Sequence, residues 1–172
     1  MNSISFEDSE LFLIVDVETT GLPTKRNAHY SEVKHWPRIV QMSWGIYKKS
    51  GEEVKLEDHI IYPDKFEINV ESSKIHGIYQ EQAIAEGEKL VDILELFQKD
   101  VNSVNYIICH NTKFDINVIK SEYFRMDKKL KKKNKAIICT MLGTTDLCKL
   151  PSKFNNSSYK YPRLGELFEF CF

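Results

Sequence analysis

Leu-Phe-Leu-Ile-Val-Asp-Val-Glu-Thr-Thr-Gly, residues 11–21, is the stretch of sequence that decides the fold. Its first five residues are all apolar, which is typical of a strand buried on both faces of a sheet. Asp16 and Glu18 then interrupt the apolar run. Because side chains alternate faces along a strand, residues two apart point the same way, so these two carboxylates emerge together at the end of a core strand.

Two adjacent carboxylates in a folded protein favour a positively charged partner. Burial of paired anions is unfavourable unless positive charge neutralises them, and a divalent metal ion is the most direct neutraliser of clustered oxygens. The alternative interpretation is a pair of ordinary strand-end acids in solvent. This stretch by itself is compatible with both interpretations.

Length and composition restrict the class of protein. A chain of 172 residues suits one domain with a single core, and a hydrophobic content of 42% argues against disorder. The formal net charge is -1, so nucleic-acid binding would depend on a local basic patch or on metal ions. Residues 1–10 do not resemble a signal peptide, and no apolar run is long enough to span a bilayer. We expect an intracellular protein, cytoplasmic or nuclear, without a membrane partner.

The cysteines point to the same compartment. The chain has four, which are spread out and lack Cys-x-x-Cys spacing, so a zinc site is not expected. Cys109 and Cys139 lie inside apolar runs, which predicts buried thiols in a reducing compartment.

Apolar periodicity predicts an α/β fold. Strands over Ile39–Tyr47 and Val54–Tyr62 follow the first strand as an antiparallel meander, after a loop over residues 22–37. In the second half, strands alternate with helices, which implies parallel pairing. The result is a mixed five-stranded sheet flanked by helices. The other expected elements are strands at 106–109 and 136–140, helices around 90–101, 112–123, 141–150 and 162–171, and a polar loop at 153–160.

A third carboxylate belongs to the same region of the predicted fold. Asp115 lies just past the strand at 106–109, whereas Asp16 and Glu18 end the first strand. Sites in open α/β sheets form at the carboxyl ends of strands. If these two strands are neighbours, the three carboxylates converge.

The motifs resemble a known family. Residues 16–22, Asp-Val-Glu-Thr-Thr-Gly-Leu, resemble the first motif of the DEDD-type 3′–5′ exonucleases, and residues 110–115, His-Asn-Thr-Lys-Phe-Asp, resemble the second. Residues 75–78, Ile-His-Gly-Ile, match a common feature of the branch that contains proofreading subunits and ribonuclease T. Residues 139–141 and 164–170 fit more loosely. The resemblance runs from residue 11 to the last residue and implies a ribonuclease H-like fold.

The resemblance also implies a reaction, the hydrolysis of single-stranded DNA or RNA one nucleotide at a time from the 3′ end. The family uses two divalent cations, Mg²⁺ or Mn²⁺. Two metals roughly 3.5–4 Å apart supply a hydroxide nucleophile, neutralise charge at phosphorus and support the leaving oxygen. By resemblance, Asp16 bridges both ions, Glu18 binds the ion on the nucleophile side, and Asp115 helps to hold the other.

Substrate contacts follow from the same resemblance. Leu22 and Phe114 are expected to pack against the terminal bases, and Thr19 and Thr20 to contact the terminal nucleotide. His76 is a further candidate substrate-binding residue.

These assignments have structural alternatives. Phe114 could belong to the core, and His76 could be purely structural. Asn111, also a candidate substrate-binding residue, is expected to cap the following helix or to orient the site rather than to act as a catalyst.

The third motif of the family is missing. It consists of a histidine, the general base, followed a few residues later by a fourth metal-binding aspartate. The last histidine here is His110, and Asp127 and Asp146 follow no suitable histidine. We therefore expect residues 1–172 to form a single exonuclease-like domain that is incomplete at the C-terminus, with weakened metal affinity and turnover. The alternative is a catalytically weak or inactive module that binds nucleic acid or a polymerase.

The expected partners are the 3′ ends of single-stranded nucleic acid and, as a further candidate, a polymerase. The lysine-dense stretch Lys128–Lys135 is either a phosphate contact or a solvated helix end. An unrelated α/β domain whose acids match by chance is the third interpretation.

Overall fold

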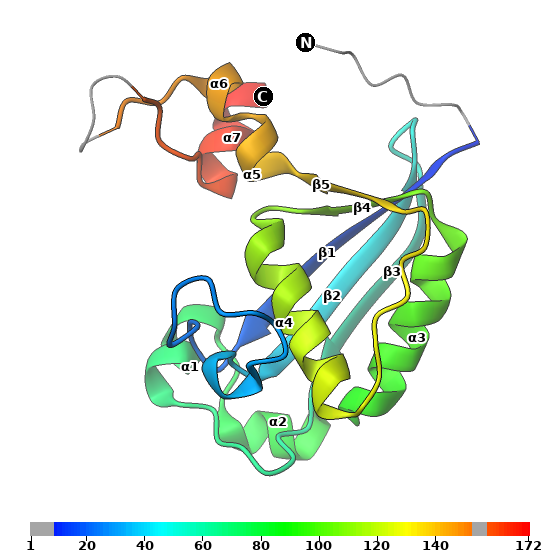
Figure 1. Ribbon diagram of the computed structural model, residues 1–172, viewed down its shortest axis with the longest axis vertical. Coiled ribbons are helices and arrows are strands. Elements are labelled where there is room, and N and C mark those ends of the chain that lie inside the picture. The colour runs from blue at the N-terminus through cyan, green and yellow to red at the C-terminus, as the bar shows by residue number, and fades with distance from the viewer. Residues whose placement is uncertain (1–8, 153–157) are drawn as a thin grey trace.

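The structure, a computed structural model, describes residues 9–152 and 158–172 (Figure 1). Most of the polar loop expected over residues 153–160 lies outside the described residues. Five strands form one sheet in the order β3-β2-β1-β4-β5, so the predicted mixed five-stranded sheet is confirmed. β1 pairs antiparallel with β2 and parallel with β4. The strands are β1 Leu11–Thr19, β2 Ile39–Lys48, β3 Glu53–Ile60, β4 Tyr106–Cys109 and β5 Ala136–Cys139.

Helices lie against one face of the sheet and around its ends. Figure 1 shows α3 and α4 in front of the strands, α1 and α2 near the end where β1 finishes, and α5 to α7 beyond β5. The helix expected over residues 141–150 is divided into α5 and α6 at Thr144. No helix in the described part of the chain is long and apolar enough to cross a bilayer. The helices are α1 Val70–His76, α2 Gln80–Glu86, α3 Leu90–Ser103, α4 Thr112–Arg125, α5 Thr140–Gly143, α6 Thr145–Cys148 and α7 Leu164–Cys171, with the 3₁₀ helix η1 at Val33–His35.

The central strand is fully buried on one face but only partly buried on the other, which corrects the expectation of a strand buried on both. Leu13, Val15 and Val17 are buried in the core, whereas Ile14 on the opposite face is 46% exposed. The physical reason is that α3 and α4 cover only the face of the sheet that carries Leu13, Val15 and Val17 (Figure 1). Asp16 lies on the same open face as Ile14, because the two residues are two positions apart in the strand.

The core lies between the sheet and the two long helices. The predicted apolar face of α3 is buried, and its Phe97 packs edge-on against Trp44 of β2 with ring centroids 5.3 Å apart. Tyr123 of α4 donates a hydrogen bond of 2.6 Å to the carbonyl of Leu94 in α3. These contacts fix the position of α4, whose first turn reaches the site described below. Of the two cysteines expected to be buried, Cys109 is buried and Cys139 is half-buried, and both are free thiols.

The loop between β1 and β2 is fastened to α4 from within the protein. Glu122 of α4 is fully buried, and its Oε1 accepts hydrogen bonds from Arg38 Nε at 2.8 Å and from the Ile39 amide at 3.2 Å. Arg125 donates to the carbonyls of Val33 and Trp36 at 2.7 and 2.8 Å. The loop is therefore held beside α4 by contacts from residues more than 80 positions away in the sequence.

Candidate active site

β1 continues beyond the last residue that pairs with β4, and the candidate site is built on this free edge. The final pair of the parallel ladder is Ile14 with Ile108, so Asp16 and Glu18 lie past it. α4 begins at Thr112, three residues after β4 ends, and Asp115 in its first turn is 3% exposed. The amide of Val17 in β1 lowers the pKa of the Asp115 carboxyl, so the two groups face each other. The structure thus brings the start of α4 against the end of β1, as the sequence predicts.

The three carboxylates influence one another electrostatically. Burial, together with repulsion from Asp16 and Glu18, raises the pKa of Asp115 to about 7, and the amides of Asp115 and Val17 partly oppose the shift. Burial also raises the pKa of Asp16, against the attraction of His110. Burial and repulsion from Asp16 raise the pKa of Glu18. Each carboxylate therefore makes ionisation of its neighbours less favourable, and a positive charge placed among them would be stabilising.

The repulsion among the three carboxylates does not by itself show that they are arranged as metal ligands. In residues 9–152 and 158–172, no three or more His, Cys, Asp or Glu side chains are already grouped so as to hold a metal ion. The two strand carboxylates and the helix carboxylate are therefore electrostatic neighbours and not a preassembled cage.

A small cavity of about 170 Å³ lies at the end of β1. It brings together five of the residues predicted to form the site: Glu18, Thr19, Leu22, His76 and Phe114. Phe114 also packs against the core. Its surroundings therefore agree in part with a core residue and in part with a residue that lines a substrate cavity. The other lining residues are Val17, Gly21, Ser72 and Ile75. The roles of these residues toward substrate stay predictions.

His76 has a defined tautomer in this cavity wall. The amide of Ile78 donates to His76 Nδ1 at 3.1 Å, so the proton of the neutral ring is on Nε2. Nε2 is buried and has no hydrogen-bond partner in the described part of the chain. Burial lowers the pKa of His76, which keeps the ring neutral. His76 therefore carries an N–H donor without an acceptor.

Thr20 and Asn111 do not line the small cavity. The Thr20 hydroxyl accepts from the amide of Arg38 at 3.1 Å, and its carbonyl accepts from Asn69 Nδ2 at 2.5 Å, so Thr20 fixes the turn after β1. Asn111 stands at the N-cap position of α4, but its side chain makes no capping hydrogen bond, which corrects that expectation. Its backbone is left-handed, with φ 91°, instead of the extended conformation from which N-cap side chains reach the first turn.

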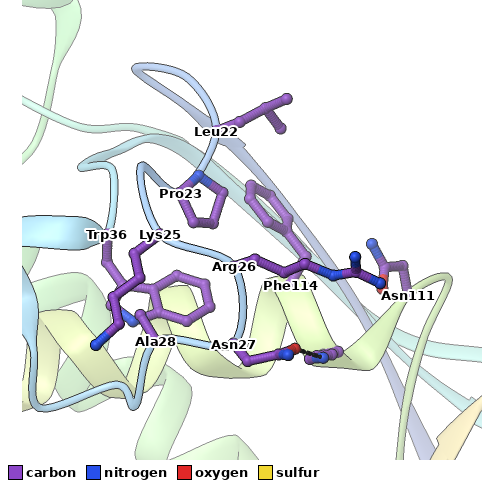
Figure 2. A pocket seen from close by; sticks show the side chains of 10 residues that line it. Leu22, Pro23, Lys25, Arg26, Asn27, Ala28, Trp36, Asn111 and Phe114 are labelled. Carbon is purple, nitrogen blue, oxygen red and sulfur yellow. Dashed lines mark hydrogen bonds between the residues drawn. The ribbon is translucent and has the colours of Figure 1, made fainter.

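A larger cavity of about 400 Å³ lies between the 22–38 loop and the start of α4 (Figure 2). Asn111 lines it, and Leu22 and Phe114 line both cavities. Its remaining lining residues are Pro23, Lys25, Arg26, Asn27, Ala28, Trp36 and Lys113. The sequence does not identify Arg26 or Trp36 as site residues, because no local pattern shows that the loop folds back on α4.

His110 has a positioning role that sequence analysis does not assign. Its Nε2 donates to the carbonyl of Pro162 at 3.0 Å, and its Nδ1 lies 3.0 Å from the Thr140 hydroxyl. It connects the end of β4 to α5 and to the segment before α7. The only sequence signal was its place in the second motif.

Two of the six lysine side chains in the lysine-dense stretch contact α3. Lys128 forms an ion pair of 2.8 Å with Glu95, and Lys135 donates to the carbonyl of Asn102 at 3.1 Å. These contacts favour the structural interpretation of the stretch over the phosphate contact.

The chain has no match among curated proteins. A solved structure of E. coli exonuclease I with a dT13 oligonucleotide is similar to it with a TM-score of 0.71 and 18% identity, over 93% of this chain and 35% of that one. Exonuclease I with the inhibitor BCBP has a TM-score of 0.72 and 18% identity over 95% and 36%. An ExoI/SSB-Ct complex has a TM-score of 0.70 and 18% identity over 94% and 36%.

These likenesses show the fold, which is the expected ribonuclease H-like one, and this chain spans about a third of the length of those proteins. The model of the family described as "RNase_T: Exonuclease" matches residues 13–169. Since this match covers most of the chain, the protein belongs to the RNase T exonuclease family, in agreement with the predicted resemblance.

Proposed function

We propose that this chain is the nuclease domain of a 3′–5′ exonuclease that trims single-stranded DNA or RNA with the help of divalent cations. The observation that carries the proposal is the convergence of Asp16, Glu18 and Asp115 next to a cavity lined by Leu22 and Phe114. Membership of the exonuclease family supports it. Exonuclease I, which has the same fold, has been crystallised with dT13, and this supports a single strand as the ligand.

The chemistry of the three side chains fits a divalent cation. Carboxylate oxygens are the preferred ligands of Mg²⁺ and Mn²⁺. Within the described residues, Asp16, Glu18 and Asp115 form no ion pair with a lysine or arginine. Repulsion from Asp16 and Glu18 raises the pKa of Asp115, and a bound cation would relieve that repulsion. These three residues would therefore hold the cations. When bound, the cations would neutralise charge on the phosphodiester and favour attack by water.

The remaining residues would position the 3′-terminal nucleotide. The apolar side chains of Leu22 and Phe114 offer surfaces for a base, and Leu22 is 81% exposed. The Nε2–H of His76 has no partner but is buried in the cavity wall, so it would donate to an acceptor oxygen of the nucleotide only after the wall shifts to expose it. Thr19 donates its hydroxyl to the carbonyl of Gly21 at 2.7 Å, so its role toward substrate would be to fix the backbone of the turn.

A second candidate function is a binding module for nucleic acid or for a polymerase. The observation that favours it is that, in residues 9–152 and 158–172, no three or more His, Cys, Asp or Glu side chains are grouped so as to hold a metal ion. Such a module would keep the cavities and bind a strand without cleaving it.

A cleavage assay distinguishes these functions. A strand labelled at its 5′ end, DNA and RNA in parallel, is incubated with the protein and Mn²⁺ or Mg²⁺. We expect a ladder that shortens from the 3′ end and that is lost in Asp16→Asn. Asp92→Asn on the exposed side of α3 is the matched control and should retain activity. Cation-dependent binding without cleavage would support the binding module, and cleavage that persists in Asp16→Asn would contradict the proposed site.

A further inference from the structure

The larger cavity adjoins the proposed site of the terminal nucleotide. Leu22 and Phe114 line the small cavity on one side and the large cavity on the other. A strand whose last nucleotide lies in the small cavity must therefore pass these two side chains, and the large cavity is then next to its second nucleotide. At about 400 Å³, the large cavity falls within the size range of pockets for small ligands.

The walls of the large cavity combine apolar rings with amide groups. Figure 2 shows the rings of Pro23, Trp36 and Phe114 around the cavity. Trp36 is 8% exposed and its indole N–H donates to the carbonyl of His29 at 3.0 Å, so the ring is held in place. Flat, rigid apolar surfaces of this kind suit a nucleobase, which stacks through its π-face whatever its sequence.

The rim of the cavity is cationic and the residues that line it include no acid. Lys25 is neutralised by Glu32, with 2.6 Å between Nζ and Oε1. Lys113 donates to the neutral Oδ1 of Asn27 at 2.5 Å and so keeps its net charge.

Arg26 is the second cation whose charge is not compensated. It forms no hydrogen bond or ion pair with any residue that the structure describes, and its side chain is exposed. Figure 2 shows it extending from the loop toward Asn111, the residue that precedes α4. Uncompensated arginine and lysine side chains that line the same cavity are suited to a phosphate group.

We propose that the large cavity is a second nucleotide subsite, in which Arg26 and Lys113 bind the phosphate on the 5′ side of the penultimate nucleotide. Its base lies against Leu22, Pro23 and Phe114. This inference rests on the proposed function, because it takes the terminal nucleotide to be in the small cavity. The two subsites differ in charge: Glu18 lines the small one, whereas cations surround the large one.

Short thymidine ligands test the subsite. Affinities of pT, TpT and pTpT are measured by NMR titration of the labelled protein, with Ca²⁺ in place of Mg²⁺ to limit hydrolysis. Only pTpT carries the phosphate assigned to Arg26 and Lys113. We expect Arg26→Ala/Lys113→Ala to weaken pTpT binding by about a hundredfold, the effect of losing two charge-assisted hydrogen bonds of about tenfold each. The affinities for pT and TpT should be unchanged.

Two controls make the outcome specific. Lys65→Ala/Lys99→Ala removes the same charge from exposed positions outside both cavities and should leave the affinity for pTpT unchanged. Arg26→Ala alone, which removes no intramolecular partner, should also weaken pTpT and reduce the salt dependence of its binding by about 0.7 in the logarithmic slope.

The results also separate this inference from the proposed function. If pT and pTpT bind but the Arg26 and Lys113 variants bind pTpT as well as the wild type does, the second subsite is wrong and the proposed function stands. If none of the three ligands binds, both the proposed function and the subsite are overturned. Amide shifts confined to residues 17–22 and 72–76 with pTpT would also exclude the large cavity as the second site.

Discussion

Asp115 is a buried carboxylate whose pKa is raised by burial and by its carboxylate neighbours. Its folded pKa of about 7 is above the value of an exposed aspartate, so the folded protein binds this proton more tightly than the unfolded chain does. Its contribution to stability is therefore complete below the unfolded pKa and is lost as the pH rises from about 4 to 7.

This sign leads to a prediction for the free energy of unfolding. We expect the wild type to lose stability between pH 5 and pH 7.5, by about 2–4 kcal/mol at most from this group. Asp115→Asn, which is neutral at every pH, should remove most of that loss. Urea unfolding at several pH values checks the prediction. An equally steep pH dependence in the variant would show that Asp115 is already ionised in the folded protein at low pH.

His76 is a second residue whose proposed role depends on one proton, the one on Nε2 that would be donated to the nucleotide. We expect His76→Ala to weaken binding of pT by about tenfold through loss of the Nε2–H donor, with a smaller effect on stability. His76→Asn, which retains an N–H donor, should restore part of the affinity. Titration of pT and urea unfolding measure the two effects separately. Unchanged affinity together with a large loss of stability would make His76 a structural residue only.

At the scale of elements, α4 has two tasks: it carries Asp115 and it holds the 22–38 loop. The loop is fastened by the fully buried carboxylate of Glu122, whose partner Arg38 also lies over the ring of Phe66 at 4.5 Å. Removal of one partner from a buried ion pair leaves the other charge buried without compensation.

We therefore predict that Glu122→Ala lowers the free energy of unfolding by about 3 kcal/mol. The exposed pair Lys48–Glu52 provides the control, and Glu52→Ala should change stability by less than about 1 kcal/mol. Denaturant unfolding of both variants gives the comparison. A loss in Glu122→Ala no larger than that in Glu52→Ala would mean that the loop is held by other contacts, such as those of Arg125.

The elements also show where sequence reasoning succeeds. Alternation in Ile39–Tyr47 predicts β2, and the apolar spacing of Leu90 to Val101 predicts the buried face of α3, because both patterns follow directly from local geometry. The apolar run 11–15 predicts the strand but not its open face. Exposure of Ile14 depends on which helices cover the sheet, and the strand's own residues do not encode that.

At the scale of the whole molecule, the convergence of Asp16, Glu18 and Asp115 could be predicted from strand ends and the resemblance. The large cavity could not be predicted from the sequence. It lies between α4 and a loop more than 80 residues earlier in the chain, and Glu122 and Arg125 hold that loop against the helix. Without knowledge of that contact, nothing in the sequence distinguishes Arg26 from any other exposed arginine. Long-range contacts of this kind leave no periodic signal in the sequence.

Direct binding of Mn²⁺ tests most directly whether the three carboxylates form a cation site. Isothermal titration calorimetry would compare the wild type with Asp16→Asn and Asp115→Asn, with Asp92→Asn as the control on α3. We predict that the wild type and the control bind Mn²⁺ with the same affinity and that both site variants bind at least about tenfold more weakly, because each loses a carboxylate ligand. Equal Mn²⁺ affinity in all four proteins, or no binding by the wild type, would contradict the account.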